Sequence, residues 1–216
     1  MAERFLIVNA DDLGLSAAVN EGVFEAHAQG VVTSASLMVL RPDAAAAGEE
    51  FHKHPRLAVG LHLAAAEDCL SQLERFRELV GRDPTHLDSH KHVHESDPGL
   101  GAEAERLAAE LRVPLRNRGV RYERSFYGRD KDGSSAPEAI SVEHLAALIR
   151  ELPPGWTEIG CHPAAGPVPT SSYDAERQVE LRTLCDPSIR EALNVTNVKL
   201  CSFAQVIRPQ RRTFGT

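Results

Sequence analysis

The chain has 216 residues, of which 42% are hydrophobic, and this is enough for one α/β domain with a sizeable core. A formal net charge of −7 without a basic stripe excludes nucleic acid from the partners that we expect. No run approaches the roughly 18 apolar residues of a membrane span, and no signal-peptide pattern opens the chain. Four cysteines without C-x-x-C spacing indicate reduced thiols in a cytoplasmic protein, not a disulfide framework or a zinc ribbon.

Strand-like and helix-like patterns alternate along the chain. A continuous apolar run predicts a buried strand over 5–9, a polar loop follows at 11–14, and Ser16 is a plausible N-cap for a helix over 17–29. Further strands are expected over 31–40, 57–63, from 85, and over 114–118, 156–161 and 198–201. Further helices are expected after Pro42, over 70–80, 99–112, 141–152 and 173–193, and the Gly/Ser-rich stretch 119–140 predicts a mobile surface loop.

This alternation is typical of βαβ units and a parallel sheet. Six or seven such units favour a distorted or incomplete (β/α) barrel over an open sheet, in a single domain over residues 1–207. The Arg-rich residues 208–216 form a C-terminal tail in this interpretation.

Residues 85–95 hold four of the ten histidines of the chain at alternate positions. If the segment is an extended strand and its exit, the side chains of His86, Asp88, His90, His92 and His94 share one face. A buried strand face favours aliphatic side chains, whereas neutral imidazole is the commonest metal ligand and an aspartate can orient a ligating ring. The alternative is a His-rich surface loop.

Other strands also end in residues that can bind a metal ion or transfer a proton. The first ends in the run from Asn9 to Asp11 and Asp12, the third at His62, and a late strand at His162. A barrel brings the carboxyl ends of its strands into one cleft, so these side chains can meet although they are far apart in sequence. Each also has a structural alternative: the aspartates can cap the next helix, His62 can be a core histidine, and His162 can simply end a strand.

Together these motifs resemble those of the YdjC family. The resemblance covers residues 5–165 and rests on four segments, Leu6–Gly14, Gly60–His62, Pro84–His94 and Cys161–Pro163. It implies a distorted (β/α) barrel and a divalent-metal-dependent hydrolase that removes acetyl groups from amino sugars such as chitooligosaccharides. It also implies a small N-acetylated sugar as partner and a homodimer.

The resemblance also assigns roles to residues. Asp12, His62 and His90 would ligate one divalent metal ion, Asp11 would be the general base and His162 the general acid. The metal would be magnesium, zinc or another transition metal. Supporting or substrate-contacting positions would be Asn9, His86, Asp88, His92 and His94, with the last two at the rim of the cleft.

Several features leave the substrate and the reaction class open. The segment between His62 and Thr85 is short for a chitooligosaccharide enzyme, and Lys91 replaces a histidine common in that run. Two histidines and a carboxylate also occur in non-haem Fe(II) oxygenases, and a non-catalytic metal-dependent sugar-binding protein is a further alternative. Asp11 and Asp12 can both face the cleft only if the strand has ended in a turn, which Gly14 favours.

Overall fold

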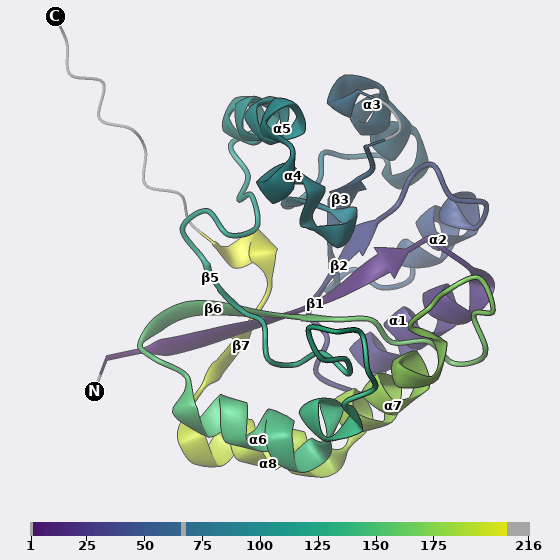
Figure 1. Cartoon of the computed structure of the whole chain (residues 1–216). Coiled ribbons are helices and arrows are strands. Elements are labelled where there is room, and N and C mark those ends of the chain that lie inside the picture. Colours follow the sequence, from purple (N-terminus) through teal and green to yellow (C-terminus); the bar gives the residue numbers. More distant parts are fainter. Residues whose placement is uncertain (1, 66–67, 207–216) are drawn as a thin grey trace, which may run out of the picture.

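A parallel sheet forms the centre of the molecule (Figure 1). The computed structural model describes residues 2–65 and 68–206, so the tail predicted at 208–216 lies outside the described residues. The strands are β1 (Arg4–Leu13), β2 (Ser34–Leu37), β3 (Ala58–Leu63), β4 (Leu87–Ser89), β5 (Arg121–Glu123), β6 (Gly155–Cys161) and β7 (Lys199–Cys201). Their order is β4-β3-β2-β1-β6-β5, and β7 also pairs with β1. The fold is therefore a single α/β domain with an incomplete (β/α) barrel, as the sequence predicted.

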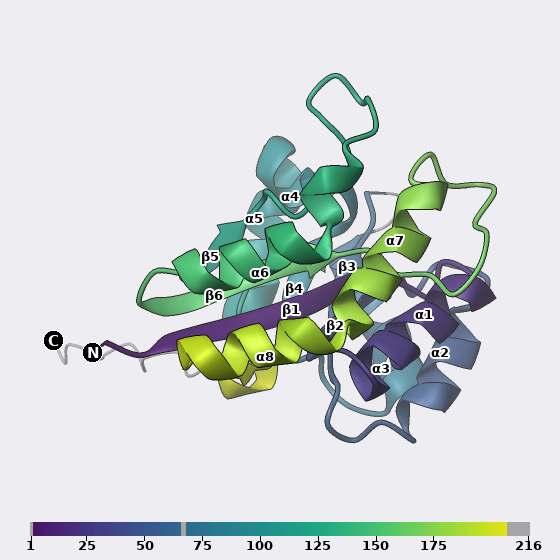
Figure 2. The ribbon, with the colours of Figure 1, turned by 90° about the horizontal axis from the view of Figure 1, so that it is seen from below.

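The described residues form eight α-helices, which are arranged around the sheet (Figures 1 and 2). They are α1 (Ala17–Ala28), α2 (Ala44–Phe51), α3 (Cys69–Val80), α4 (Val93–Ser96), α5 (Pro98–Leu111), α6 (Val142–Glu151), α7 (Asp174–Cys185) and α8 (Pro187–Thr196). Helix α3 packs against α2 and α5, while α1 packs against α7 and α6 against α8. No helix in the described part of the chain combines the length and the apolar character needed to cross a membrane.

The register of the central strands explains why distant motifs meet. Strand β1 pairs with β6 up to the pair Ala10↔Cys161, so Asp11 and His162 emerge side by side. Strand β3 pairs with β4 through His62↔Asp88, which places these two side chains together on the neighbouring strands. Leu6, Ile7 and Val8 of β1 are fully buried because both faces of the strand are covered. Leu6 and Val8 belong to the main core, while Ile7 packs with Val120 and Phe203, which is why this strand is a continuous apolar run.

The barrel is open between β4 and β5. Among the described residues these two strands share no ladder, and the strand expected at 114–118 is reduced to a single parallel bridge between Leu87 and Leu115. The amide of Leu87 donates to the carbonyl of Pro114, and the amide of Arg116 donates to the carbonyl of Leu87. These two bonds fix Arg116 against β4 before the chain crosses to β5.

Three other segments differ from the sequence-based expectation. The strand expected over 31–40 is limited to Ser34–Leu37, and the loop expected over 119–140 contains β5 and a 3₁₀ turn at Pro137–Ile140. The helical region expected over 173–193 is two helices, because Pro187 begins α8 and the side chain of Asp186 caps it. The other two differences concern short strands, whose extent depends on pairing with strands remote in sequence more than on local pattern.

Gly22 allows α1 to lie directly on the chain that follows His162. A Cβ atom at Gly22 would lie 2.5 Å from the Cα of Ala164, although alanine normally stabilises a helix interior. We expect Gly22→Ala to lower the free energy of unfolding by about 1–3 kcal/mol through this overpacking. Gly166→Ala, whose Cβ would meet nothing closer than 3.8 Å, is the control in urea denaturation. Equal stabilities of the two variants would contradict the predicted clash.

Candidate functional site

The carboxyl ends of β1, β3 and β6 open into a cleft of about 630 Å³. Its lining includes Asp11, Asp12, His62, His90 and His162. The structure thus brings together the five residues to which the family resemblance assigned metal binding and acid–base roles. The cleft lies where the chemistry of (β/α) barrels is found.

A bulge in β1 turns both aspartates toward the cleft. Between the pairs Ala10↔Ala35 and Leu13↔Leu37, strand β1 contains one residue more than β2. Asp12 takes up the extra residue with φ 65°, and its carbonyl accepts a hydrogen bond from the amide of Leu15. A bulge of this kind changes the direction in which a side chain points. Both aspartates therefore face the cleft from within β1, whereas the sequence had predicted a turn after the end of the strand.

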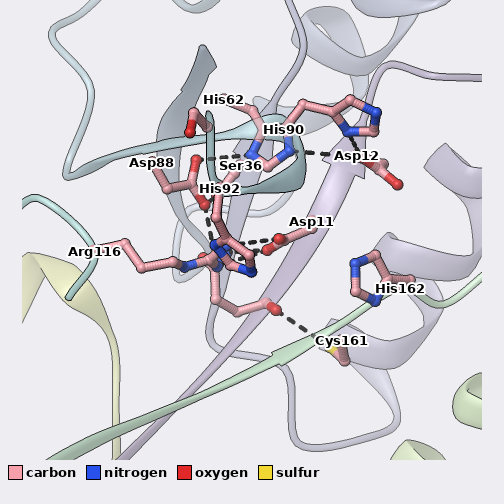
Figure 3. Close-up of polar contacts among 12 residues, drawn as sticks. Asp11, Asp12, Ser36, His62, Asp88, His90, His92, Arg116, Cys161 and His162 are labelled. Atoms are coloured by element: carbon pink, nitrogen blue, oxygen red, sulfur yellow. Dashed lines mark hydrogen bonds and ion pairs between the residues drawn. The ribbon is translucent and has the colours of Figure 1, made fainter. Parts of the chain in front are cut away.

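Three side chains converge on one point of this cleft (Figure 3). His90 Nδ1 lies 3.1 Å and His62 Nε2 lies 3.5 Å from Asp12 Oδ1. One ligand atom from each of the three residues lies within 4.8 Å of the other two. This is one carboxylate oxygen and two imidazole nitrogens in a cluster of a size that a single cation can fill.

Asp88 holds His62 in the orientation that a metal ligand needs. His62 Nδ1 donates to Asp88 Oδ1 at 2.8 Å, which leaves Nε2 directed at Asp12. Burial lowers the pKa of His62, but Asp88 and Asp12 outweigh burial and raise this pKa to about 10. The position between the two carboxylates therefore favours a positive charge, either a proton on His62 or a divalent cation. Asp12, His62 and His90 offer the oxygen and nitrogen atoms that fit such a cation.

Arg177, from α7, binds the other oxygen of Asp12. Its Nη2 lies 2.6 Å from Asp12 Oδ2, and both side chains are almost fully buried. Burial raises the pKa of Asp12, but hydrogen bonds from His62 and His90 and the charge of Arg177 hold it well below its usual value. Asp12 is therefore ionised at neutral pH, as a metal ligand must be.

Arg116 is fully buried beneath the cleft and contacts three carboxylates. It binds Asp11 through both terminal nitrogens, at 2.6 and 2.7 Å, and its Nη2 lies 3.1 Å from Asp88. Its Nε donates to Glu158 at 2.8 Å. Burial raises the pKa of Asp11, but Arg116 outweighs burial and lowers it, so Asp11 stays ionised in a fixed orientation.

Glu158 is the carboxyl group of this cluster that most readily takes up a proton. It is fully buried on β6, and its Oε2 has no hydrogen-bond partner in the described structure. Burial raises the pKa of Glu158, the charge of Arg116 offsets only part of this, and the pKa is about 7. The Arg116 cluster can therefore change its protonation state near neutral pH.

His162 directly follows β6 and lines the cleft with the two aspartates, and Glu180 of α7 lies next to it. The backbone N–H of His162 donates to Glu180, and the ring Nδ1 lies 3.8 Å from the same carboxylate. Tyr173 donates its hydroxyl to Glu180 at 2.5 Å. Burial lowers the pKa of His162, but Glu180 outweighs burial and raises it. The imidazole is thus held in an environment that favours its protonated form.

The expectation of one shared histidine face over 85–95 is wrong beyond residue 89. Strand β4 ends at Ser89, and Lys91 and His92 have φ of 54° and 53°, so alternation no longer applies. His92 does line the cleft, beside Tyr122. His94 does not reach the rim but is buried, with its Nδ1 2.5 Å from Ser89 Oγ.

Asn9, His86 and Asp88 belong to a polar layer below the cleft. Ser36 links them: its hydroxyl donates to Asp88 at 2.7 Å, accepts from the side-chain Nδ2 of Asn9 at 2.8 Å and lies 3.2 Å from Nε2 of His86. His86 also stacks on Phe203 with ring centroids 4.0 Å apart, and burial lowers its pKa to about 3. His86 is therefore neutral and supports Asp88 instead of meeting a ligand.

The family model for YdjC-like proteins matches residues 5–71 and 64–195 of the chain. The chain belongs to the YdjC-like family. The resemblance stated from the motifs is therefore confirmed, and the overlapping matches together span most of the sequence.

Similar proteins agree with this membership. A carbohydrate deacetylase of Geobacillus stearothermophilus is 33% identical over 94% of this chain and 98% of the relative. That alignment extends over 250 positions, although this chain has 216 residues, so the relative contains segments that this chain lacks.

Solved structures show the same fold. A candidate cellobiose-phosphate cleavage protein of Enterococcus faecalis V583 superimposes with a TM-score of 0.80 and 26% identity over 94% of this chain and 98% of that one. A family 4 carbohydrate esterase of Streptomyces lividans, solved with acetate, has a TM-score of 0.55 and 9% identity over 94% and 93% of the two chains. At this identity the second likeness concerns the fold alone.

Four charged residues of the site were missed in the sequence analysis. They are Arg116, Glu158, Arg177 and Glu180. Glu158 is a charged residue inside an apolar strand, and Arg116 follows the apolar segment Val113–Leu115. In α7, polar residues occupy the buried positions that a core-facing helix normally fills with apolar side chains. These four residues could have been predicted from one signal, a charged residue at a position where the pattern requires an apolar one.

The raised pKa of Glu158 predicts a pH-dependent contribution to stability. Since this acid binds its proton more tightly in the folded than in the unfolded chain, its contribution falls as pH rises from about 4.5 to 7. We expect the stability of Glu158→Gln relative to the parent to increase over this range, in urea denaturation with a metal chelator present. Glu49→Gln, at an exposed position of α2, is the control. A difference independent of pH would contradict the assignment.

Proposed function

We propose that the chain is a carbohydrate deacetylase, a divalent-metal-dependent hydrolase that removes the acetyl group from an N-acetylated amino sugar and releases acetate. One observation carries the proposal: Asp12, His62 and His90 converge within 4.8 Å, and Asp11 and His162 line the same cleft. The names of relatives that align over nearly their whole length support the same reaction class. A protein that only bound sugar would not need both a buried base and a separate acid.

A divalent ion held by Asp12, His62 and His90 would supply Lewis-acid polarisation of the acetyl carbonyl and a lowered pKa for the attacking water. The chain provides the rest. Asp11 is ionised, faces the cleft and is fixed by Arg116, so it is placed to accept the proton of the attacking water. Its low pKa makes it a weak base, which its fixed orientation offsets.

The departing amine requires a proton, because an amide nitrogen leaves poorly as an anion. His162 emerges beside Asp11 at the ends of the paired strands β6 and β1, and Glu180 raises its pKa, so the protonated ring is available near neutral pH. The pKa of Asp11 is lowered and that of His162 is raised, so Asp11 can accept a proton as the base while His162 donates one as the acid. The carbonyl carbon must lie between them for both proton transfers to occur.

Acetate release tests the proposal directly. Purified protein, stripped of metal and supplied in turn with zinc, magnesium, manganese, cobalt and nickel, should release acetate from N-acetylglucosamine oligosaccharides with at least one ion. Release without oxygen or a 2-oxoacid separates deacetylation from oxygenase chemistry. Tight sugar binding without acetate under every ion would favour a binding protein instead.

His90→Ala and Asp11→Asn should separate metal binding from base catalysis. His90→Ala removes one of three convergent ligand atoms, so we expect loss of both bound metal and activity. Asp11→Asn should keep bound metal but lower kcat by about 10²–10⁴-fold, the usual contribution of a general base. Metal content by elemental analysis and kcat by acetate release provide the two measurements. Parental kcat in Asp11→Asn would refute the base assignment.

Glu180→Gln should move the alkaline limb of the kcat/KM profile to lower pH. Glu180 raises the pKa of His162, so its neutral replacement lets the ring lose its proton at lower pH. Glutamine can still accept the backbone N–H of His162, which keeps the local structure. Glu191→Gln, at an exposed position of α8, is the control, and its profile should coincide with that of the parent. An unmoved limb in Glu180→Gln would show that His162 is not the acid.

A further inference from the structure

Tyr127 presents an exposed aromatic ring in the wall of the cleft. It lies in the segment between β5 and the 3₁₀ turn, and 41% of it is exposed although the preceding Phe126 is buried. Tyrosine is of intermediate burial in most proteins, but here the exposed side chain lines a cleft. The mechanism above does not use Tyr127, so its exposure needs a separate explanation.

The geometry defines which part of the Tyr127 ring is free. One face stacks on Tyr173, with ring centroids 4.6 Å apart and an angle of 5° between the planes. Since that face is covered, the exposure belongs to the opposite face and the edges. The ring also meets His162 at 5.7 Å in an edge-on arrangement. A flat apolar surface therefore stands free in the cleft beside the proposed general acid.

The residues after Tyr127 hold this surface rigidly. The amide of Gly128 donates to the hydroxyl of Tyr173 at 2.6 Å, and its carbonyl accepts from the amide of Ala136 at 2.8 Å. A Cβ atom at Gly128 would lie 2.8 Å from Ile140 Cδ1, so the chain is closely packed there. Arg129 then binds Glu176 at 3.0 Å. The ring is ordered before any ligand arrives, which reduces the entropy lost on binding.

We propose that the free face of Tyr127 is the surface on which the sugar ring of the substrate stacks. A pyranose ring has an apolar C–H face and hydroxyl groups around its edge, so it can cover an aromatic face while its hydroxyls stay hydrogen-bonded. The contact with His162 implies that this is the sugar carrying the departing amine or the one next to it. The inference rests on the proposed deacetylation and adds the residue that selects a sugar over an acyclic acetamide.

Three substitutions of Tyr127 separate stacking from other roles. Tyr127→Leu removes the flat ring but keeps an apolar side chain, Tyr127→Phe removes only the hydroxyl, and Tyr127→Trp enlarges the ring. We expect Tyr127→Leu to raise KM for an N-acetylglucosamine disaccharide roughly tenfold, the size of one aromatic contact, with a smaller change in kcat. The Phe and Trp variants should stay within about twofold of the parent.

Saturation-transfer NMR with the glucosamine disaccharide, the expected product, gives a measurement that does not depend on turnover. In the parent, saturation should be strongest at the C–H protons of one ring face, and Tyr127→Leu alone should lose this pattern. Thermal unfolding and zinc binding check that each variant is folded.

The outcomes distinguish this inference from the proposed function. Acetate release by the parent with unchanged KM and unchanged NMR contacts in Tyr127→Leu would overturn the stacking role and leave the deacetylase proposal intact. If the disaccharide contacts depend on Tyr127 but the parent releases no acetate, the deacetylase proposal would be overturned and the stacking role would remain. A Phe variant as impaired as the Leu variant would also overturn stacking, because the hydroxyl would then carry the interaction.

Discussion

The burial of Arg116 among three carboxylates is the interaction on which the site depends. Asp11, Asp88 and Glu158 come from β1, β4 and β6, and without this guanidinium Asp11 would be a buried carboxylate without a cationic partner. Breaking a buried pair of this kind costs about 3–5 kcal/mol, because the remaining charge stays buried. The cluster also sets the chemistry of the cleft, since it ionises Asp11 and fixes Asp88, which in turn orients His62. Stability and reactivity thus share one set of contacts.

Much of the fold was predictable because its signals are local. The continuous apolar run of β1 and the alternation of strands with helices require only short windows of sequence. The meeting of Asp12, His62 and His162 followed from a rule of topology, since parallel strands bring their carboxyl ends to one edge. The histidine alternation failed because it assumed an extended chain, and positive φ at Lys91 and His92 turns the backbone after Ser89.

The supporting charges could not be paired from sequence, because their partners are remote. Arg116 lies 105 positions from Asp11, and Arg177 lies 165 positions from Asp12. Local pattern indicates only that a charged residue occupies an apolar position, and several acids compete for each arginine until the register of the sheet is known. Glu158 illustrates the limit: burial is the main cause of its raised pKa, and Asp11 and Asp88, which share Arg116 with it, raise it further, but no window around Glu158 contains these neighbours.

The extra residue at Asp12 makes the length of the Asn9–Leu13 tract as important as its composition. If one residue were deleted there, β1 could still pair with β2 and β6, and the core would lose little. The side-chain alternation would then run without interruption, and one of the two aspartates would point away from the cleft. A family member with every site residue present but this spacing shortened would keep the barrel and be inert, a loss that a search for residue types alone would overlook.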